Sequence, residues 1–502
     1  MVQTTLDPDL EHWLRTGGAT GSPCERVIQT SISWIFLFKD RVFKLKRPVD
    51  FGFVDFTTLE KRCWAIEREL AFNRVTAPDI YRAVHSIVRT EAGFVLDGPG
   101  EVVEWALEMR RFDETAVLSE RPETVTGDFA EGLGRDIARF HAAAPISRRE
   151  SPGVQGVLQS NTRNLRQLEG VLGPGVERLI VDATDACRAV APLLDARRAE
   201  GLVRRCHGDL HLGNILLEQG GAVLFDCIEF SDDLSEIDVL YDLAFLLMDL
   251  DFRGRSEAAN RALGGWLDEA ARSLGTSVWT GLAALPLFQS VRAAVRAHVC
   301  AHSGDTEGGS RYLAAASAHL RPDAPALVAV GGLSGSGKTT FARKLAPLFG
   351  PRPGAVIVRS DEVRKRLWGR KPTQKLPAEA YTAEAGERVY REMLEIGRLC
   401  LAAGRATVLD AVFLRPHERR AVERLAAASG VPFLGLWLQA PPEVLAERVA
   451  ARRNDASDAD RSVLDRQLAL DPGVISWRVS LSDDLEALAR TTAARLQKRP
   501  PD

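Results

Sequence analysis

A glycine-rich stretch in the second half of the chain has the residue types and spacing needed to hold phosphate groups. It runs from Gly332 to Thr339 and matches the pattern G-x-x-x-x-G-K-[ST]. Glycines let successive backbone N–H groups curl around phosphate oxygens, because a side chain there would clash. We predict that Lys338 reaches the terminal phosphates and that Thr339 supplies an oxygen to Mg²⁺. The predicted phosphate contacts come from Gly332, Ser334, Gly335, Ser336, Gly337, Lys338, Thr339 and Thr340.

Charged residues beyond this loop have the types needed for transfer of a phosphoryl group to a hydroxyl. Asp361 follows a predicted strand, where a carboxylate could orient an acceptor hydroxyl and accept its proton. Asp410 ends the next predicted strand and could hold the Mg²⁺ shell. Three arginines on a later predicted helix could face the transferred group, namely Arg448, Arg452 and Arg453. Two alternatives stay open: Asp361 could cap a helix, and the arginines could form a solvated helix face.

A second set of candidate residues lies in the first half, in the stretch His207-Gly-Asp209-Leu-His-Leu-Gly-Asn214. Asp209 can accept or orient a hydroxyl proton. Asn214 and Asp226, which ends an apolar strand, can hold Mg²⁺ against the phosphates of a nucleotide. The spacing matches the arrangement H-x-D-x-x-x-x-N followed by a metal-binding Asp. Capping of loops and turns is the structural alternative for all three side chains.

Other polar residues near this loop are expected to support it. His207 and His211 are predicted to hold the loop by hydrogen bonds and not to perform chemistry. The acidic stretch 232–251 could attract a cationic substrate. We favour a structural role in which Asp238 and Asp242 brace the loop.

Two lysines on a predicted hairpin strand could contact the phosphates of the same nucleotide. Lys44 and Lys46 lie on one face of that strand, and Glu69 on the following helix could anchor one of them. The sequence leaves the choice open, with Lys46 slightly preferred; both could instead be surface lysines. Residues 102–109 are expected to take the place of an adenine-binding hinge.

Hydrophobic patterns predict two kinds of domain. In the first half, a β-hairpin over 33–46 precedes stretches with helical spacing. In the second half, short apolar segments alternate with helical stretches, which is typical of a parallel sheet with helices on both faces. A Gly-, Asp- and Pro-containing stretch separates the halves. We predict an α+β domain at 1–305, a linker at 306–324 and an α/β domain at 325–497.

The composition is that of a globular protein of two or three domains, because 502 residues exceed what one core usually organises. Lys and Arg total 65 against 68 Asp and Glu, which gives no overall attraction to nucleic acid or anionic membranes. The seven cysteines are scattered without a C-x-x-C pair, so we expect reduced thiols and no zinc site. We expect no signal peptide, no segment near the roughly 18 apolar residues that span a membrane, and a cytoplasmic location.

The first half resembles the aminoglycoside phosphotransferase and choline kinase branch of the kinase-like fold. The resemblance covers about 25–300 and depends on the loop H-G-D-L-H-x-G-N-I-L. It implies a two-lobed α+β protein-kinase-like domain that phosphorylates a sugar or aminocyclitol hydroxyl. Two departures are the missing G-x-G-x-x-G loop and a divergent stretch at 145–200.

The second half resembles small P-loop kinases such as gluconate kinases, zeta toxins and phage polynucleotide kinase. Besides the loop, the resemblance depends on S-D-E-V-R at 360–364, L-D-A-V-F-L at 409–414 and R-x-x-x-R-R-N-D-x-S-D-A at 448–459. It implies an α/β P-loop NTPase fold in which Asp361 is the base or hydroxyl-orienting residue and Arg452 a lid arginine. The whole chain resembles bacterial fusions of these two kinds of domain.

We therefore predict a bifunctional ATP-dependent phosphotransferase that uses Mg²⁺, with Asp209 catalytic in the first half and Asp361, Lys338 and Arg452 catalytic in the second. Each half would transfer a γ-phosphoryl group to a small-molecule hydroxyl; the acceptors and the oligomeric state stay open. One alternative is that one half is a regulatory ATPase. Another is that the second half is a toxin-like or polynucleotide 5′-hydroxyl kinase, which the net charge of -3 does not favour.

Overall fold

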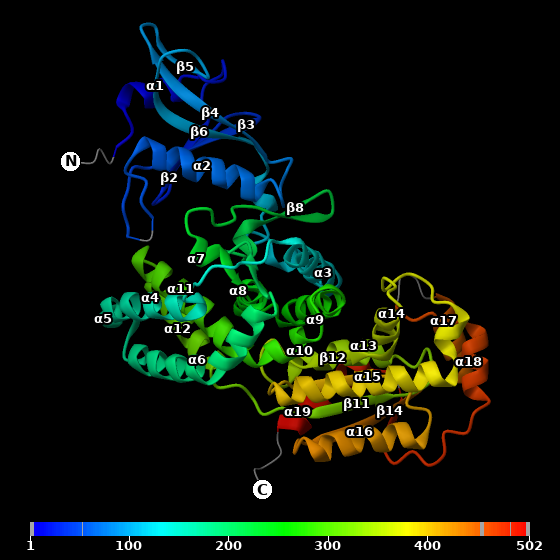
Figure 1. Cartoon of the computed structure of the whole chain (residues 1–502). Helices are drawn as coiled ribbons and strands as arrows, with labels where there is room; N and C mark the ends of the chain where they lie inside the picture. Colours follow the sequence, from blue (N-terminus) through cyan, green and yellow to red (C-terminus); the bar gives the residue numbers. More distant parts are fainter. Residues whose placement is uncertain (1–4, 53, 452–455, 482, 498–502) are drawn as a thin grey trace. The chain divides into compact units, whose positions relative to one another are not determined.

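The computed structural model describes residues 5–52, 54–451, 456–481 and 483–497 (Figure 1). It divides into two compact units that do not follow the midpoint of the chain. The first unit combines Met1–Thr124, Ala144–Gly153 and Val203–Asp242, and the second combines Val125–Ala143, Val154–Leu202 and Leu243–Asp502. The motif-bearing loop at 207–214 therefore belongs to the same unit as the N-terminal strands.

The first unit contains a six-stranded antiparallel sheet with strand order β1-β2-β3-β6-β4-β5. Leu10 of α1 packs in the hydrophobic cluster on one face, and Ile66 of α2 packs in the cluster on the other face. Side chains alternate along a strand, so Lys44 and Lys46 share the α2 face with Val42. The elements are β1 (Arg26–Gln29), β2 (Ser33–Leu37), β3 (Arg41–Lys46), β4 (Tyr81–Thr90), β5 (Gly93–Leu96), β6 (Glu101–Arg110), α1 (Pro8–Arg15) and α2 (Leu59–Asn73).

Short elements complete the first unit and carry the predicted catalytic loop. The loop lies between two pairs of antiparallel strands, β7 with β10 and β8 with β9. The elements are η1 (Glu114–Ala116), η2 (Pro122–Thr124), β7 (Val203–Arg205), η3 (Leu212–Asn214), β8 (Ile215–Glu218), β9 (Gly221–Leu224), α7 (Asp232–Ser235) and β10 (Glu236–Asp238).

The second unit contains a group of packed helices. Helix α8 begins in the first unit and continues into the second. Helices α3 and α9 cross so closely that a Cβ on Gly134 would lie 2.1 Å from the carbonyl oxygen of Ala262. The elements are α3 (Gly127–Ala143), α4 (Gly153–Gln167), α5 (Glu169–Leu172), α6 (Gly175–Ala199), α8 (Val239–Phe252), α9 (Ser256–Ser273), α10 (Ser277–Thr280), η4 (Gly281–Ala284), α11 (Leu285–His302) and α12 (Thr306–His319).

The prediction of a linker at 306–324 is wrong over most of its length, because helix α12 occupies Thr306–His319. Its side chains Tyr312, Leu313 and Ala316 are buried in one cluster with residues of α6 and α11. Thr306 to His319 is therefore part of a packed helical core, and the connection to the next sheet begins only after it. The Gly-rich composition of 304–309 suggested a boundary, but burial of the following apolar side chains outweighs that local signal.

Among the described residues, one helical stretch, Ser277–His302, is long and apolar enough to cross a membrane, with an 18-residue window of mean hydropathy 1.2. The expectation that no segment approaches this composition is therefore wrong. Within the structure, 78% of that window is buried, and Ala293, Ala294 and Ala297 pack in the core beside α6 and α12. A core helix of a globular domain passes the same test, and the burial fits that role.

The rest of the second unit is an α/β domain with a five-stranded sheet of order β12-β13-β11-β14-β15, and the predicted parallel arrangement is confirmed. Phe341 of α13 and Ala489 of α19 pack against Val408 on one face. Leu409, the next residue of β13, points to the opposite face, where it lies near Gly397 of α15 and close to Leu425 of α16. Helices therefore cover both faces of the sheet.

The elements of this domain follow the alternation of strands and helices expected from the sequence. They are β11 (Leu327–Gly331), α13 (Lys338–Leu345), η5 (Ala346–Leu348), β12 (Val356–Arg359), α14 (Ser360–Leu367), η6 (Ala378–Tyr381), α15 (Ala383–Ala402), β13 (Thr407–Asp410), α16 (Pro416–Ala428), β14 (Phe433–Gln439), α17 (Pro442–Ala451), α18 (Arg461–Leu468), β15 (Arg478–Leu481) and α19 (Leu485–Gln497).

Candidate active sites

The first candidate site brings together Lys44, Glu69 and Asp226, which lie far apart in the sequence. Lys44 Nζ donates to Glu69 Oε1 at 2.7 Å and to Asp226 Oδ1 at 2.8 Å. Burial alone would lower the pKa of Lys44, but Asp226 and Glu69 raise it well above its usual value. The ammonium group is therefore charged and lies directly beside the predicted metal-binding carboxylate.

Lys46 has a different environment, although it lies on the same face of β3. Its side chain is 1% exposed, and Nζ contacts Glu69 Oε2 at 2.6 Å and Glu229 Oε1 at 2.5 Å. Burial raises the pKa of Glu229, whereas the two lysines outweigh burial and hold the pKa of Glu69 below its usual range. The slight preference for Lys46 as the phosphate contact is therefore not supported, because Lys44 lies next to Asp226 and Lys46 is enclosed.

The loop at 207–214 is held by buried hydrogen bonds. His207 Nε2 donates to the carbonyl oxygen of Phe225 at 2.9 Å, and burial lowers the pKa of this imidazole. Asp242 accepts from the backbone N–H groups of His207 and Gly208 at 3.1 and 2.8 Å. His211 Nδ1 accepts from the N–H of Gly213 at 3.0 Å. The structure confirms that these two histidines and Asp242 support the loop.

Asp209 and Asn214 point toward each other within this loop. Asn214 Nδ2 donates to the Asp209 backbone oxygen at 2.9 Å and to Asp209 Oδ2 at 3.0 Å. The Asp209 side chain is 38% exposed, so its carboxylate is accessible while its orientation is fixed. A base that must meet an acceptor hydroxyl needs both properties.

Asp226 occupies a backbone conformation that few residues with a side chain adopt, with a φ of 62°. Tyr81 fixes it through a hydrogen bond from the Asp226 N–H to the tyrosine hydroxyl at 3.0 Å. Asn73 Oδ1 accepts from the next backbone N–H, that of Cys227, at 2.8 Å. The sequence did not single out Tyr81, Asn73 or Glu229; only Glu229, three residues after Asp226, lay close enough to a motif to be noticed.

The predicted hinge at 102–109 is instead the interior of a strand. These residues lie in β6, between β3 and β4 in the sheet. The chain leaves the sheet after Arg110, so a connection of the hinge type begins at Arg111. A mostly apolar segment such as 102–109 is equally consistent with a strand, and its pairing with β3 and β4 places it inside the sheet.

The second candidate site is built around the glycine-rich loop between β11 and α13. A Cβ at Gly332 would lie 2.4 Å from the Leu438 carbonyl oxygen, and one at Gly335 would lie 2.6 Å from that of Leu445. Ser336 Oγ is buried and has no hydrogen-bond partner among the described residues. A loop that excludes side chains and contains an unpaired buried hydroxyl fits a phosphate chain.

Thr339 and Asp410 meet at the carboxyl edge of the sheet. Thr339 Oγ1 donates to Asp410 Oδ2 at 2.6 Å, and Asp410 is 4% exposed. Lys338 Nζ donates to the Leu333 carbonyl oxygen of the loop itself at 2.9 Å. A hydroxyl and a carboxylate in contact are oxygen ligands of the kind that Mg²⁺ prefers, so these two residues fit the predicted metal site.

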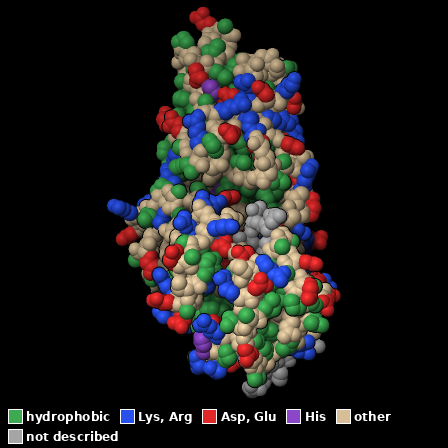
Figure 2. Space-filling view, turned by 90° about the vertical axis from the view of Figure 1, so that its right-hand side faces the viewer, with side chains coloured by type: hydrophobic (Ala, Val, Ile, Leu, Met, Phe, Trp, Pro, Cys, Tyr) green, Lys and Arg blue, Asp and Glu red, His purple; other side chains and the backbone are tan. Residues whose placement is uncertain are grey.

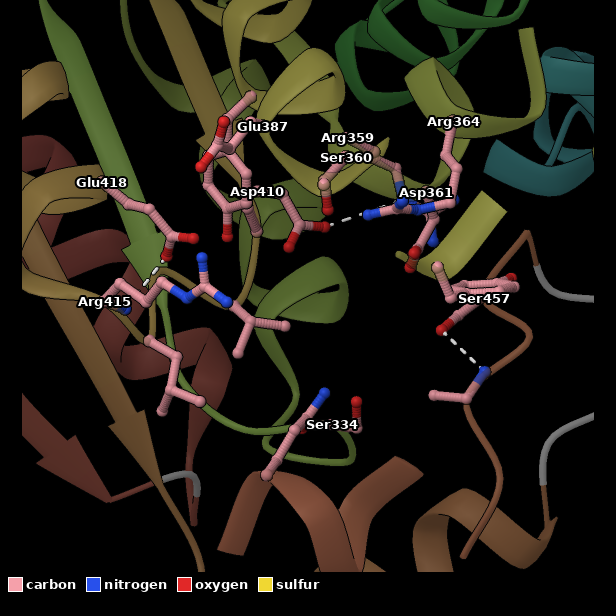
Figure 3. A pocket seen from close by; sticks show the side chains of 18 of the residues that line it. Ser334, Arg359, Ser360, Asp361, Arg364, Glu387, Asp410, Arg415, Glu418 and Ser457 are labelled. Atoms are coloured by element: carbon pink, nitrogen blue, oxygen red, sulfur yellow. Dashed lines mark hydrogen bonds and ion pairs between the residues drawn. The ribbon is translucent and has the colours of Figure 1, made fainter. Parts of the chain in front are cut away.

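A cavity of about 640 Å³ opens beside this loop. Its lining includes Asp361, Arg359 and Asp410, which point toward a common space in Figure 3, with Arg415 and Glu418 on the opposite wall. Asp361 lies in the first turn of α14, whose N-cap is Arg359. Asp361 is therefore a cavity residue and not the N-cap of this helix.

A buried ion pair fixes one wall of the cavity. Lys365, which is 1% exposed, contacts Asp458 Oδ1 at 2.7 Å. Asp458 Oδ2 also accepts from the N–H of Leu376 at 3.0 Å and from the hydroxyl of Tyr381 at 2.7 Å. Asp458 belongs to the arginine-containing motif of the sequence, and these contacts attach Asp458 itself to Lys365 of α14 and Tyr381 of η6.

The remaining residues predicted for this site differ in whether they contact the glycine-rich loop or line the cavity. Arg448 Nη1 donates to the Gly335 carbonyl oxygen at 3.4 Å, and Ser334 lines the cavity. Thr340 is exposed on α13 and does not line the cavity. Arg452 and its neighbour Arg453 lie outside the described residues.

Two family models match separate parts of the chain. A model described as "Phosphotransferase enzyme family" matches residues 69–283, and a model described as "AAA domain" matches residues 327–471. The first range contains the 207–214 loop and Asp226, and the second contains the glycine-rich loop and the cavity. The predicted resemblance to a kinase-like half fused to a P-loop half is confirmed.

Relatives extend over most of the chain. The Mycobacterium tuberculosis (strain H37Rv) protein named "Uncharacterized protein Rv2004c" is 31% identical over 468 residues, which is 88% of this chain and 89% of that protein. The adenylyl-sulfate kinase of Myxococcus xanthus is 32% identical over 117 residues, covering 23% of this chain and 59% of the kinase. Among solved structures, the Plasmodium vivax ethanolamine kinase is 12% identical, covers 59% of this chain and 81% of its own, and has a TM-score of 0.38.

Proposed function

This chain belongs to the same protein family as Rv2004c of Mycobacterium tuberculosis and is a phosphotransferase, and we propose that it carries two ATP-dependent transfer sites. Each site passes the γ-phosphoryl group of ATP to a hydroxyl group of a small molecule. The proposal is supported by two groups of polar side chains: Lys44 contacts Asp226 and Asn214 contacts Asp209 in the first half, and Thr339 contacts Asp410 beside the glycine-rich loop in the second.

In the first site, Lys44 is the phosphate contact and Asn214 and Asp226 hold Mg²⁺. The distance of 2.8 Å between Lys44 and Asp226 supports this assignment. Asp209 is the base that orients the acceptor hydroxyl and receives its proton, because its carboxylate is accessible and its position is fixed by Asn214. Lys46 pairs with both Glu69 and Glu229, and Glu69 in turn pairs with Lys44.

In the second site, Lys338 and the backbone of the glycine-rich loop contact the phosphates. Thr339 and Asp410 hold Mg²⁺, which neutralises phosphate charge when bound. Asp361 orients the acceptor hydroxyl from the first turn of α14. A cavity of about 640 Å³ beside the loop has room for an acceptor, which favours a kinase over an ATPase that needs only a water molecule.

The acceptor is a polar small molecule of the sugar or aminocyclitol class in this proposal. The cavity of the second site presents carboxylates and guanidinium groups together, and such a lining suits a polyhydroxylated molecule better than an apolar one. Basic and acidic side chains are interspersed on the face of the molecule drawn in Figure 2. With a net charge of -3, this distribution does not favour a polynucleotide acceptor.

Phosphorus NMR with a panel of sugars, aminocyclitols and nucleosides tests the proposal. We expect Asp209→Asn to remove one phosphorylated product and Lys338→Ala to remove another, each leaving the other product unchanged. Asp361→Asn should lose the same product as Lys338→Ala while retaining ATP binding. Asp40→Asn, a change of an exposed carboxylate on the hairpin turn, is the matched control. Free phosphate alone, whatever the acceptor, contradicts the proposal and favours a regulatory ATPase.

A further inference from the structure

A largely buried glutamate, Glu362, lies behind the second site and takes no part in the proposed chemistry. Glu362 is in the first turn of α14 and its side chain is 14% exposed. Its Oε1 accepts from Arg359 Nη1 at 3.1 Å and lies 3.6 Å from Arg135 Nη2 on α3. One carboxylate oxygen is therefore shared between a cation of the P-loop half and a cation of the phosphotransferase half.

Arg359 connects this glutamate to the proposed metal ligands. Its Nη2 donates to Thr339 Oγ1 at 3.5 Å, and its Nε lies 3.6 Å from Asp410 Oδ2. The Arg359 and Asp410 side chains are only 7% and 5% exposed. The guanidinium group thus lies between two carboxylates, Asp410 on the metal side and Glu362 on the far side (Figure 3 shows the Arg359–Asp410 contact).

A cation beside a metal-binding carboxylate competes with the metal ion for that carboxylate. Little water screens this competition, because Arg359 and Asp410 are buried. A second carboxylate on the far side offsets the charge of the guanidinium group and attracts it in the opposite direction. The position of Arg359 between the two carboxylates therefore determines how much of Asp410 is available to Mg²⁺.

We propose that Glu362 is a positioning residue for the second site: its shorter contact with Arg359 weakens the hold of that guanidinium group on Asp410 and Thr339, which stay available to Mg²⁺. The proposal rests on the proposed function of this site. Glu362 acts through Arg359 and has no part in the transfer itself.

Helices of the phosphotransferase half hold Glu362 from behind. Arg135 contacts Glu131 at 3.0 Å and also pairs with Asp268 of α9. Asp268 in turn pairs with Arg366 of α14 at 3.2 Å. All of these residues belong to the second compact unit. Through Glu362, helices α3 and α9 thus contribute to the site of the P-loop half, which the family models assign to a separate domain.

Titration of Mg²⁺ against nucleotide binding tests the proposal without relying on turnover. The full-length chain carries Lys44→Ala to silence the first site, and calorimetry follows binding of a non-hydrolysable ATP analogue at increasing MgCl₂. Removing direct outer-shell partners of metals costs about 10–100-fold in affinity. Glu362 acts one residue further away, so Glu362→Gln should raise the half-saturating Mg²⁺ concentration by roughly three- to tenfold.

The double variant separates positioning from structural damage. Arg359→Gln should lower the Mg²⁺ requirement because it removes the competing cation, and adding Glu362→Gln should then change nothing further. Glu423→Gln is the matched control, since Glu423 accepts from Trp477 Nε1 at 2.8 Å but does not line the cavity. It should leave the Mg²⁺ requirement unchanged.

Two outcomes overturn the inference and are distinguishable from failure of the proposed function. An unchanged Mg²⁺ requirement in Glu362→Gln refutes the inference alone, provided that Lys338→Ala abolishes binding. The inference is also refuted if Glu362→Gln raises the Mg²⁺ requirement equally in the wild-type background and in the Arg359→Gln background. Glu362 would then act by a route that does not involve Arg359. Binding that survives Lys338→Ala refutes the proposed function of the loop, and with it this inference.

Discussion

Replacing the two lysines of β3 one at a time should give opposite results, although they are two residues apart on one face. Lys44→Met should weaken nucleotide binding at the first site with little change in stability. Lys46→Met should lower the free energy of unfolding. The reason is that Lys44 lies beside the accessible Asp226, whereas Lys46 is enclosed by Glu69 and Glu229.

The expected loss of unfolding free energy in Lys46→Met comes from the carboxylate that loses its partner. Glu69 keeps Lys44, but Glu229, which is 3% exposed, loses the ammonium group that contacts it and must be protonated in the folded state. Protonating a glutamate of ordinary pKa (about 4.3) at pH 7.5 costs about 4 kcal/mol. This agrees with the roughly 3–5 kcal/mol measured for broken buried pairs. If the first unit unfolds by itself, at a size of roughly 150–250 residues, its unfolding midpoint should fall by roughly 8–16 °C.

The expected loss of nucleotide affinity in Lys44→Met comes from lost contacts with phosphate. Asp226 is 46% exposed and Glu69 keeps Lys46, so the cost in stability should be about 1 kcal/mol or less. A charge-assisted hydrogen bond contributes about 2–3 kcal/mol, which corresponds to roughly 30- to 150-fold weaker nucleotide binding.

The assay combines thermal unfolding with calorimetric ATP binding in a chain whose second site is silenced by Lys338→Ala. Lys39→Met, on the exposed hairpin turn, is the matched control and should change neither quantity. The destabilisation in Lys46→Met should shrink from about 4 kcal/mol at pH 7.5 to about 1 kcal/mol at pH 5, because Glu229 is protonated more cheaply there. An unchanged unfolding midpoint in Lys46→Met, together with lost ATP binding, would refute this assignment and identify Lys46 as the phosphate contact.

Three further predictions concern other parts of the chain. Gly335→Ala should abolish ATP binding at the second site by equilibrium binding, because its Cβ would lie 2.6 Å from the Leu445 carbonyl oxygen; retained affinity would show that the loop adapts. Burial raises the pKa of Glu131 but its arginine neighbours outweigh burial and lower it to about 2, so the stabilisation is present above about pH 4.3 and is lost as pH falls toward 2. Acid unfolding of wild type and Glu131→Gln should therefore converge in that window, and a constant difference would contradict the ion-pair role. Burial raises the pKa of the Cys227 thiol, so it should resist iodoacetamide at pH 8 in a mass-spectrometric assay, whereas rapid labelling would show that the Asp226 turn opens.

The motifs could be predicted from the sequence because their chemistry is local. Gly332 to Thr339 form a phosphate loop through consecutive backbone groups, and the five-residue spacing from Asp209 to Asn214 fixes a contact within one loop. The parallel sheet of the second half was also predictable, since short apolar strands alternate with helices there.

The predictions of the linker and of the hinge were wrong because these segments are determined by contacts with distant parts of the chain. Thr306–His319 is a helix because Tyr312 and Leu313 find a core on α6 and α11, and residues 102–109 are a strand because β3 and β4 lie on either side. Local composition does not show whether a segment packs against residues that are distant in the chain.

Residue types and local spacing alone predicted two phosphate-transfer sites and the loops that would carry them. Only the tertiary structure decided that Lys44 and not Lys46 lies beside Asp226, a contact across 182 residues, because strand register and the position of α2 select between two lysines on one face. It also decided that Glu362 shares its oxygen between Arg359 and Arg135, because α3 must pack against the start of α14 before one carboxylate can meet both cations.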